Sequence, residues 1–280
     1  MSYQRKTIIM KNRAEVHEYH APHIGRHDKR RSRADPTPEE QKKVNQRRRE
    51  QQLRWLLNTN FDDGTDAFVT FGFPKDQRPR TVSEMQREAR LLCRRLRKEY
   101  KNFGFTLKYV YTIEVGPRGA RHIHMVLSDV SALLLYACWP YGVINIQPLR
   151  THGEYSDLAA YMTKYWQKTE DTAEATGEKI GGKSYYGSRN LEKPLIIQET
   201  IRESELSKDP PKLDGWIMGT VNEGVSDLTQ RPYREVRYIR DRMKPAKLPK
   251  KKSLFARAKE AGGKLAERLK RLLKRRGGGD

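Results

Sequence analysis

Apolar and polar positions alternate in several short stretches, and this alternation predicts β-strands. The clearest are residues 68–73, 107–115 and 121–129, where every second side chain is apolar or β-branched. Successive side chains of a strand point to opposite faces, so each stretch can turn one face towards a core. Shorter apolar runs at residues 142–146 and 195–197 predict two further strands.

A period near 3.6 residues predicts helices between these strands, over residues 37–57, 81–102, 131–137 and 154–168. The first begins with Thr37, Pro38 and Glu40, which suit a capped helix start. Residues 169–182 are polar and predict a loop.

The order of these elements is strand, helix, two-strand hairpin, helix, strand, helix, strand. Few connections are long enough for a fully parallel sheet, so we predict an α+β fold with a mainly antiparallel central sheet and helices packed on one side. We expect a basic flexible arm over residues 1–36, a central domain over residues 37–205 and a basic extension over residues 206–280.

Charge narrows the choice of partner. The net charge is +22 and the sequence pI is about 10.0, which favours a polyanion, with nucleic acid first and an anionic membrane surface second. Residues 244–280 are strongly basic, and we expect them to bind DNA phosphates, with a membrane surface or a protein partner as alternatives. No signal peptide and no stretch long enough to span a bilayer is visible. Cys93 and Cys138 are interpreted as buried free thiols of a reducing compartment.

Two histidines share one face of the strand over residues 121–129. His122 and His124 are two positions apart, so both imidazoles project to the same side and can hold a divalent metal ion. Glu114, near the end of the preceding strand, is the best placed carboxylate for a third ligand. The alternative is that both histidines only pack. Four histidines near the N-terminus, His17, His20, His23 and His27, also suggest a metal knuckle, but a flexible arm is the favoured interpretation.

A tyrosine-rich helix is the second chemical element. Tyr161, Lys164 and Tyr165 fall on one helical face, with Lys168 one turn further. In isolation, the simpler interpretation is that the tyrosines pack with their hydroxyls at the rim. A phenol ionises near pH 10, but an adjacent metal ion or cation lowers the cost of the phenolate and allows covalent catalysis.

Residues 177–184 match the P-loop pattern letter for letter. A phosphate-binding loop follows a buried strand and opens a helix. Here a polar segment precedes the motif and Tyr185-Tyr186-Gly187 follows it, so we interpret the match as accidental and expect any helicase to be a separate protein.

Together these motifs resemble the HUH endonucleases, specifically the rolling-circle replication initiators. Residues 68–73 are similar to the first strand motif of that family, and His122-Ile123-His124 with Glu114 is similar to its metal motif. Residues 161–168 are similar to its tyrosine motif in the two-tyrosine form. Residues 37–61 and 188–194 are similar to a branch from bacterial plasmids and small phages, and the likeness extends over residues 37–201.

The resemblance implies a mechanism. Mg²⁺ or Mn²⁺ held by Glu114, His122 and His124 would bind the scissile phosphate of single-stranded origin DNA. Tyr161 would attack it to leave a 5′-phosphotyrosine and a 3′-hydroxyl primer, and Tyr165 could perform a second transfer. Lys164 and Lys168 would supply positive charge. A host helicase and a polymerase in the bacterial cytoplasm are the implied partners.

Two other functions remain open at this point. One is a relaxase or transposase with the same chemistry. The other is a non-catalytic, basic nucleic-acid-binding protein whose histidines and tyrosines only stack and pack.

Overall fold

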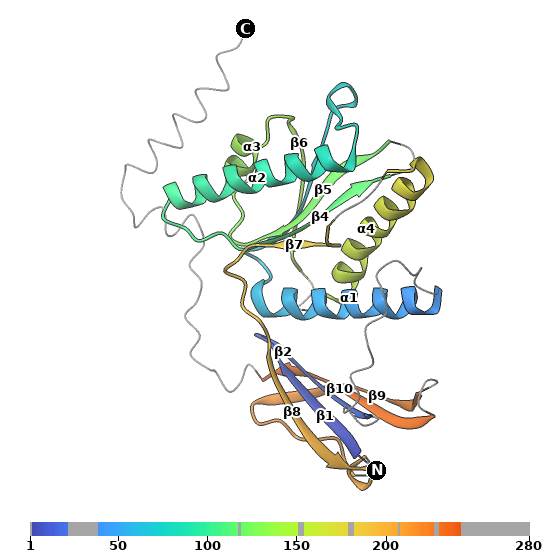
Figure 1. Cartoon of the computed structure of the whole chain (residues 1–280). Helices are drawn as coiled ribbons and strands as arrows, with labels where there is room; N and C mark the ends of the chain where they lie inside the picture. Colours follow the sequence, from blue (N-terminus) through green and yellow to red (C-terminus); the bar gives the residue numbers. More distant parts are fainter. Residues whose placement is uncertain are drawn as a thin grey trace. The chain divides into compact units, whose positions relative to one another are not determined.

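The computed structural model describes residues 2–21, 39–116, 119–150, 154–178, 182–206, 208–226 and 230–241. These residues form two compact units, each built around a five-stranded antiparallel sheet (Figure 1). The helix α1 (Glu39–Asn60) contributes residues to both units. The α+β class and the mainly antiparallel sheet are therefore confirmed.

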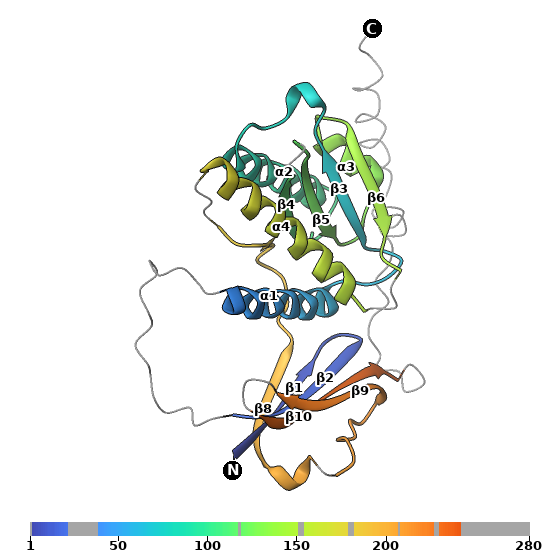
Figure 2. The same cartoon turned by 90° about the vertical axis from the view of Figure 1, so that its right-hand side faces the viewer.

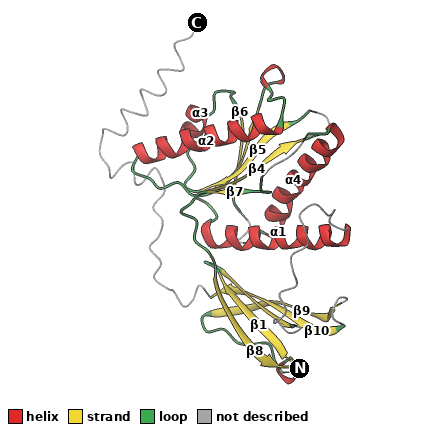
Figure 3. Ribbon diagram, viewed as in Figure 1, coloured by secondary structure: helices red, strands yellow, loops and turns green. Residues whose placement is uncertain are grey.

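The sheet that carries the two histidines has the strand order β6-β3-β5-β4-β7 (Figure 3). Its register pairs Glu114 with His122 on neighbouring strands, and places Thr70 and Thr112 on either side of His124. The strands are β3 (Ala67–Gly72), β4 (Tyr109–Val115), β5 (Arg121–Leu127), β6 (Val143–Pro148) and β7 (Tyr186–Gly187).

One face of this sheet is covered by α2 (Val82–Asn102) and α3 (Ala132–Cys138). The helix α2 begins where the Thr81 side chain accepts a hydrogen bond from the Glu84 amide, and it buries one apolar face. That face packs with Phe71, Ile113 and Ile123 of the sheet in a single hydrophobic core. Cys93 and Cys138 are buried in this core as free thiols, as the sequence predicts.

The opposite face of the same sheet is covered by α4 (Ser156–Thr176), as Figure 2 shows. Ile123 and His124 project to opposite faces because they are neighbours in a strand. Ile123 packs into the core beneath α2, whereas His124 stacks on Tyr165 of α4. The expectation that the helices pack on one side is therefore wrong for α4.

Two threonines attach α4 to the edge of β4. The strand β7 is only two residues long and pairs with Val110 and Tyr111, so β4 has no strand partner on that side beyond Tyr111 within the described residues. There the Thr169 hydroxyl accepts a hydrogen bond from the Val115 amide at 2.9 Å and donates towards the Ile113 carbonyl at 3.1 Å. Thr172 donates to the Val115 carbonyl at 3.0 Å.

The predicted loop over residues 169–182 is wrong in its first part, because α4 continues through Thr172 to Thr176. Gly177 then ends the helix with a left-handed φ of 70°. The P-loop-like stretch thus follows a helix instead of a strand, which agrees with its rejection; residues 179–181 lie outside the described residues.

The second sheet has the order β8-β1-β2-β10-β9. Its small core contains Val16, Val236 and Tyr238, and a buried ion pair joins Arg234 to Glu18. The strands are β1 (Ser2–Ile9), β2 (Arg13–His20), β8 (Leu195–Arg202), β9 (Trp216–Ser226) and β10 (Arg231–Arg240).

This sheet corrects three expectations. Residues 2–20 are paired strands and not a flexible arm, because their charged side chains have partners within the sheet. The run 195–197 begins β8, which pairs with β1 and not with the histidine-bearing sheet. Residues 216–240 form a hairpin within the expected basic extension. Thr37, Pro38 and residues 244–280 lie outside the described residues.

None of the helices in the described residues combines the length and the apolar character that crossing a bilayer requires.

We predict that Thr169→Val destabilises the protein by about 1–3 kcal/mol, because it leaves the Val115 amide buried without its acceptor. Thr169→Ser, which keeps the hydroxyl, should lose less. The measurement is urea unfolding followed by tryptophan fluorescence. Thr176→Val, at an exposed position on the same helix, is the control, and an equal loss in both valine variants would contradict the attachment of α4 through Thr169.

Candidate active site

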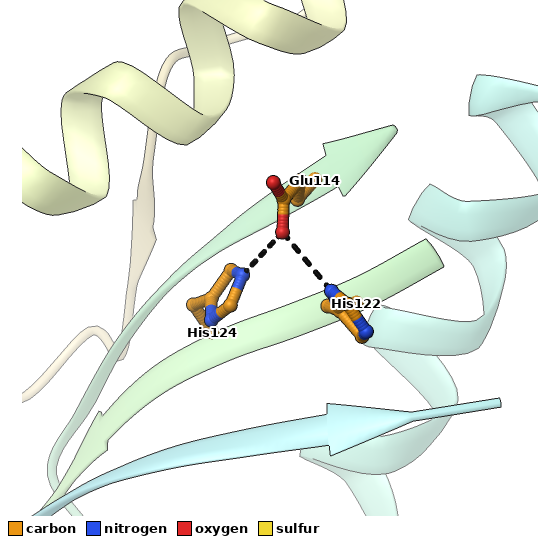
Figure 4. A group of neighbouring side chains, drawn as sticks. All are labelled: Glu114, His122 and His124. Carbon is orange, nitrogen blue, oxygen red and sulfur yellow. Dashed lines mark hydrogen bonds and ion pairs between the residues drawn. The ribbon is translucent and has the colours of Figure 1, made fainter. Parts of the chain in front are cut away.

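Glu114, His122 and His124 meet on the face of the sheet that α4 covers (Figure 4). One carboxylate oxygen, Oε2 of Glu114, lies 3.0 Å from Nδ1 of His122 and 3.0 Å from Nε2 of His124. The sequence-predicted trio is therefore brought together by strand register alone, since Glu114 and His122 are directly opposite on β4 and β5.

The other oxygen of this carboxylate binds a cation. Lys168 on α4 donates from Nζ to Oε1 of Glu114 at 2.9 Å. Burial by itself would raise the pKa of Glu114, but the hydrogen bonds with His122, His124 and Lys168 outweigh it and hold the pKa well below its usual range. Glu114 is consequently a carboxylate at neutral pH.

His124 is held in place from several sides. The ring of Tyr165 stacks on it with 3.8 Å between centroids, and the ring of Phe68 lies parallel at 5.7 Å. Thr70 Oγ1 lies 3.1 Å from Nδ1, so a ring that donates Nδ1–H to Thr70 leaves Nε2 free as a ligand atom. Burial lowers the pKa of His124, which favours the neutral imidazole that metals bind.

This donor set fits a divalent metal ion. Two imidazole nitrogens and one carboxylate oxygen lie within 4.8 Å of one another, and all three come from two paired strands. The side chains of Glu114 and His124 are only 8% and 4% exposed, whereas that of His122 is 37% exposed. The group is therefore accessible from the side of His122, as a site that also binds a substrate requires.

The two tyrosines of α4 have different environments. Tyr161 is 49% exposed, whereas Tyr165 is 6% exposed between His124 and Tyr161. The rings of Tyr161 and Tyr165 meet edge to face at 4.4 Å, and Phe68 also contacts Tyr161 edge to face at 6.0 Å. Burial and the neighbouring Tyr161 and Glu114 raise the pKa of Tyr165 well above its usual range.

The two lysines of the predicted site also differ. Lys168 pairs with Glu114, and its Nζ lies 4.9 Å from the centre of the Tyr165 ring. Lys164 is exposed, and among the described residues it makes no ion pair with the trio. Sequence reasoning missed Thr70 and Thr169, which orient His124 and α4.

These residues fall inside the stretch of the chain that matches a known family. Residues 66–170 match the family model of the replication-associated protein ORF2. The match contains Phe68, Glu114, His122, Tyr161 and Lys168, and it supports the role of a replication initiator. Comparisons with curated proteins and with solved structures give no significant match.

A second group of potential ligands lies in the other unit, on β2 and β10, where Glu15, His17 and Glu235 come together. Glu15 accepts a hydrogen bond from the Trp55 indole at 2.8 Å, and Arg237 pairs with Glu235 at 3.0 Å. These carboxylates therefore already have neutralising or donating partners.

The N-terminal histidine knuckle is not supported where it can be tested. His17 pairs with Lys6 and His20 with Tyr3 across β1 and β2, so these two histidines project to opposite faces of the sheet. His23 and His27 lie outside the described residues.

We predict that Thr70→Val weakens Mn²⁺ binding about 10-fold, because groups that orient a histidine ligand contribute on that scale. Titration of Mn²⁺ by electron paramagnetic resonance measures it. Thr112→Val is the matched control, because Thr112 flanks His124 on the other side but donates to the Ser184 carbonyl. Equal effects of the two substitutions would show that Thr70 has no special role.

Proposed function

We propose that this protein is a replication initiator that nicks single-stranded origin DNA by tyrosine attack and later rejoins it. The observation that carries the proposal is the exposed Tyr161, which adjoins the ligand group through Tyr165 and His124. A net charge of +22 suits a DNA substrate, and the family match supports the same role.

Tyr161 is the proposed first nucleophile. Its phenol oxygen forms a bond to the phosphorus at the nick site as the phenol proton is lost. The bond from phosphorus to the 3′-oxygen breaks, and that oxygen takes up a proton. The products are a 5′-phosphotyrosine and a 3′-hydroxyl, which primes rolling-circle synthesis.

Glu114, His122 and His124 would hold the metal ion, with Mg²⁺ or Mn²⁺ as the proposed ions. A divalent ion bound there would polarise the phosphoryl oxygens and offset the charge that develops during transfer. Two imidazole ligands favour Mn²⁺ over the more strictly oxygen-binding Mg²⁺.

The lysines and Tyr165 have supporting roles in this proposal. Lys168 fixes the orientation of Glu114 by holding Oε1, which leaves Oε2 towards the imidazoles. Lys164, exposed on the same helix, would contact the DNA backbone. Tyr165 is the candidate for the second transfer, which rejoins the displaced strand. Its ring must leave His124 first, so the two tyrosines would act in sequence.

The remaining parts of the proposal concern partners. Priming from a 3′-hydroxyl requires a polymerase, and strand displacement requires a helicase. We propose that the host supplies both, in the cytoplasm of a bacterial cell that carries the parent phage or plasmid.

We predict that Tyr161→Phe abolishes a covalent protein–DNA adduct and that His122→Ala removes its dependence on Mn²⁺ together with most of its yield. Tyr165→Phe should retain the adduct, because phenylalanine keeps the ring that stacks on His124. The assay uses labelled single strands that tile the parent replicon, with Mn²⁺ or EDTA, and denaturing gels.

Tyr136→Phe is the control for a neutral loss of a phenol, because Tyr136 is an exposed tyrosine on α3 of the same unit. Loss of the adduct in Tyr165→Phe alone would assign the first attack to Tyr165. Absence of any adduct from the wild type, with tight DNA binding retained, would favour the non-catalytic DNA-binding protein.

A further inference from the structure

A hollow of about 420 Å³ lies beside α2, on the face of the sheet opposite to Glu114 and the histidines. Its lining combines three arginines of α2 with a row of tyrosines from β4 and β7. The proposed nicking chemistry uses none of these side chains. All of them belong to the same compact unit.

The arginines form a continuous cationic rim. Arg90, Arg94 and Arg97 are spaced by four and three residues, so they lie on one side of α2 at intervals of roughly 6 and 4.5 Å along its axis. All three are exposed, and among the described residues none forms an ion pair with a carboxylate. Arg97 donates from Nε to the Cys93 carbonyl at 3.3 Å, a backbone contact that leaves the rest of its guanidinium group accessible. The charge of the rim is thus available to an anionic ligand.

The tyrosines form an aromatic wall next to this rim. The rings of Tyr109 and Tyr111 lie 6.2 Å apart with 30° between their planes, and those of Tyr111 and Tyr186 lie 5.2 Å apart with 18°. Tyr186 is the most accessible of the three, being half-buried where the other two are buried. Burial raises the pKa of Tyr109 to about 12, so this wall is uncharged at neutral pH.

We propose that this hollow binds one or two nucleotides of a single DNA strand. The guanidinium groups of Arg90, Arg94 and Arg97 would pair with successive phosphates, and a base would lie against Tyr186. Arginine matches phosphate oxygens in a two-pronged geometry, and aromatic side chains stack on any base without regard to sequence. An acidic peptide could use the arginines but has no planar group for the aromatic wall.

The proposed site is independent of the chemistry at Tyr161. It would anchor a strand on the α2 side of the sheet while the nick site lies on the α4 side, so the two sites would contact different segments of DNA. Failure of one would leave the other testable, because strand binding here requires neither the metal ligands nor the nucleophile.

The experiment compares two triple substitutions in the full chain that also carries Tyr161→Phe, so that no covalent adduct forms. The first is Arg90→Ala, Arg94→Ala and Arg97→Ala together. The second is Arg87→Ala, Arg95→Ala and Lys98→Ala together, which removes the same charge from exposed positions of the same helix outside the lining. Fluorescence anisotropy with a labelled single-stranded oligonucleotide gives affinity at several salt concentrations.

We expect the first triple to weaken binding by at least about 10-fold and to reduce the slope of log affinity against log salt by roughly 2, since each phosphate contact on a single strand contributes about 0.7. The second triple should change both much less. Equal losses in the two triples would overturn the proposal, because the effect would then be one of net charge.

Tyr186 tests the aromatic wall separately. Tyr186→Leu should weaken binding about 10-fold without changing the salt slope, whereas Tyr186→Phe should bind like the parent protein. Circular dichroism melting of both variants checks folding. Competition distinguishes the ligand classes: an unlabelled oligonucleotide should displace the probe, and polyglutamate of equal charge should not. Displacement by polyglutamate at the same concentration, or wild-type affinity of Tyr186→Leu, would contradict a nucleotide site.

Discussion

The hydrogen bonds of Thr169 and Thr172 to the edge of β4 determine where every other group of the site lies. Beyond its short pairing with β7, β4 needs partners for Ile113 and Val115, and α4 provides them. This attachment sets the height of α4 over the sheet. One turn before Thr169, Tyr165 reaches His124, and the residue just before Thr169, Lys168, reaches Glu114. The backbone of a strand edge thus aligns a helix with side chains on the neighbouring strand.

Glu114 is the second dependency, since a buried carboxylate needs compensation. It receives two imidazoles on one oxygen and an ammonium group on the other, from β5 and α4. A charge removed from water is costly unless it is paired and hydrogen-bonded. The same three partners that make the ionised form stable also fix its orientation. Ligand geometry and electrostatic stability therefore come from one set of contacts.

The extent to which the sequence predicts this structure depends on the range of the interactions. His122, His124 and Glu114 were predictable because strand periodicity and one hairpin bring them together. Thr70 and Thr169 were not, because a threonine shows its acceptor only in the folded chain. The sheet of β1, β2 and β10 was missed for a related reason. Glu18 lies at a buried position, where its partner Arg234 is 216 residues away, so the local pattern looked like a solvated arm.

The short β7 has one more consequence, which concerns solubility. An unpaired strand edge invites a strand from another molecule to add to it, and proteins commonly block such edges. On β4 the threonines of α4 occupy the carbonyl and amide groups that an intruding strand would need. The helix that carries the tyrosines therefore also closes one margin of the sheet against self-association. The opposite margin is β6, whose side chains are largely exposed, so the two edges of this sheet are protected unequally.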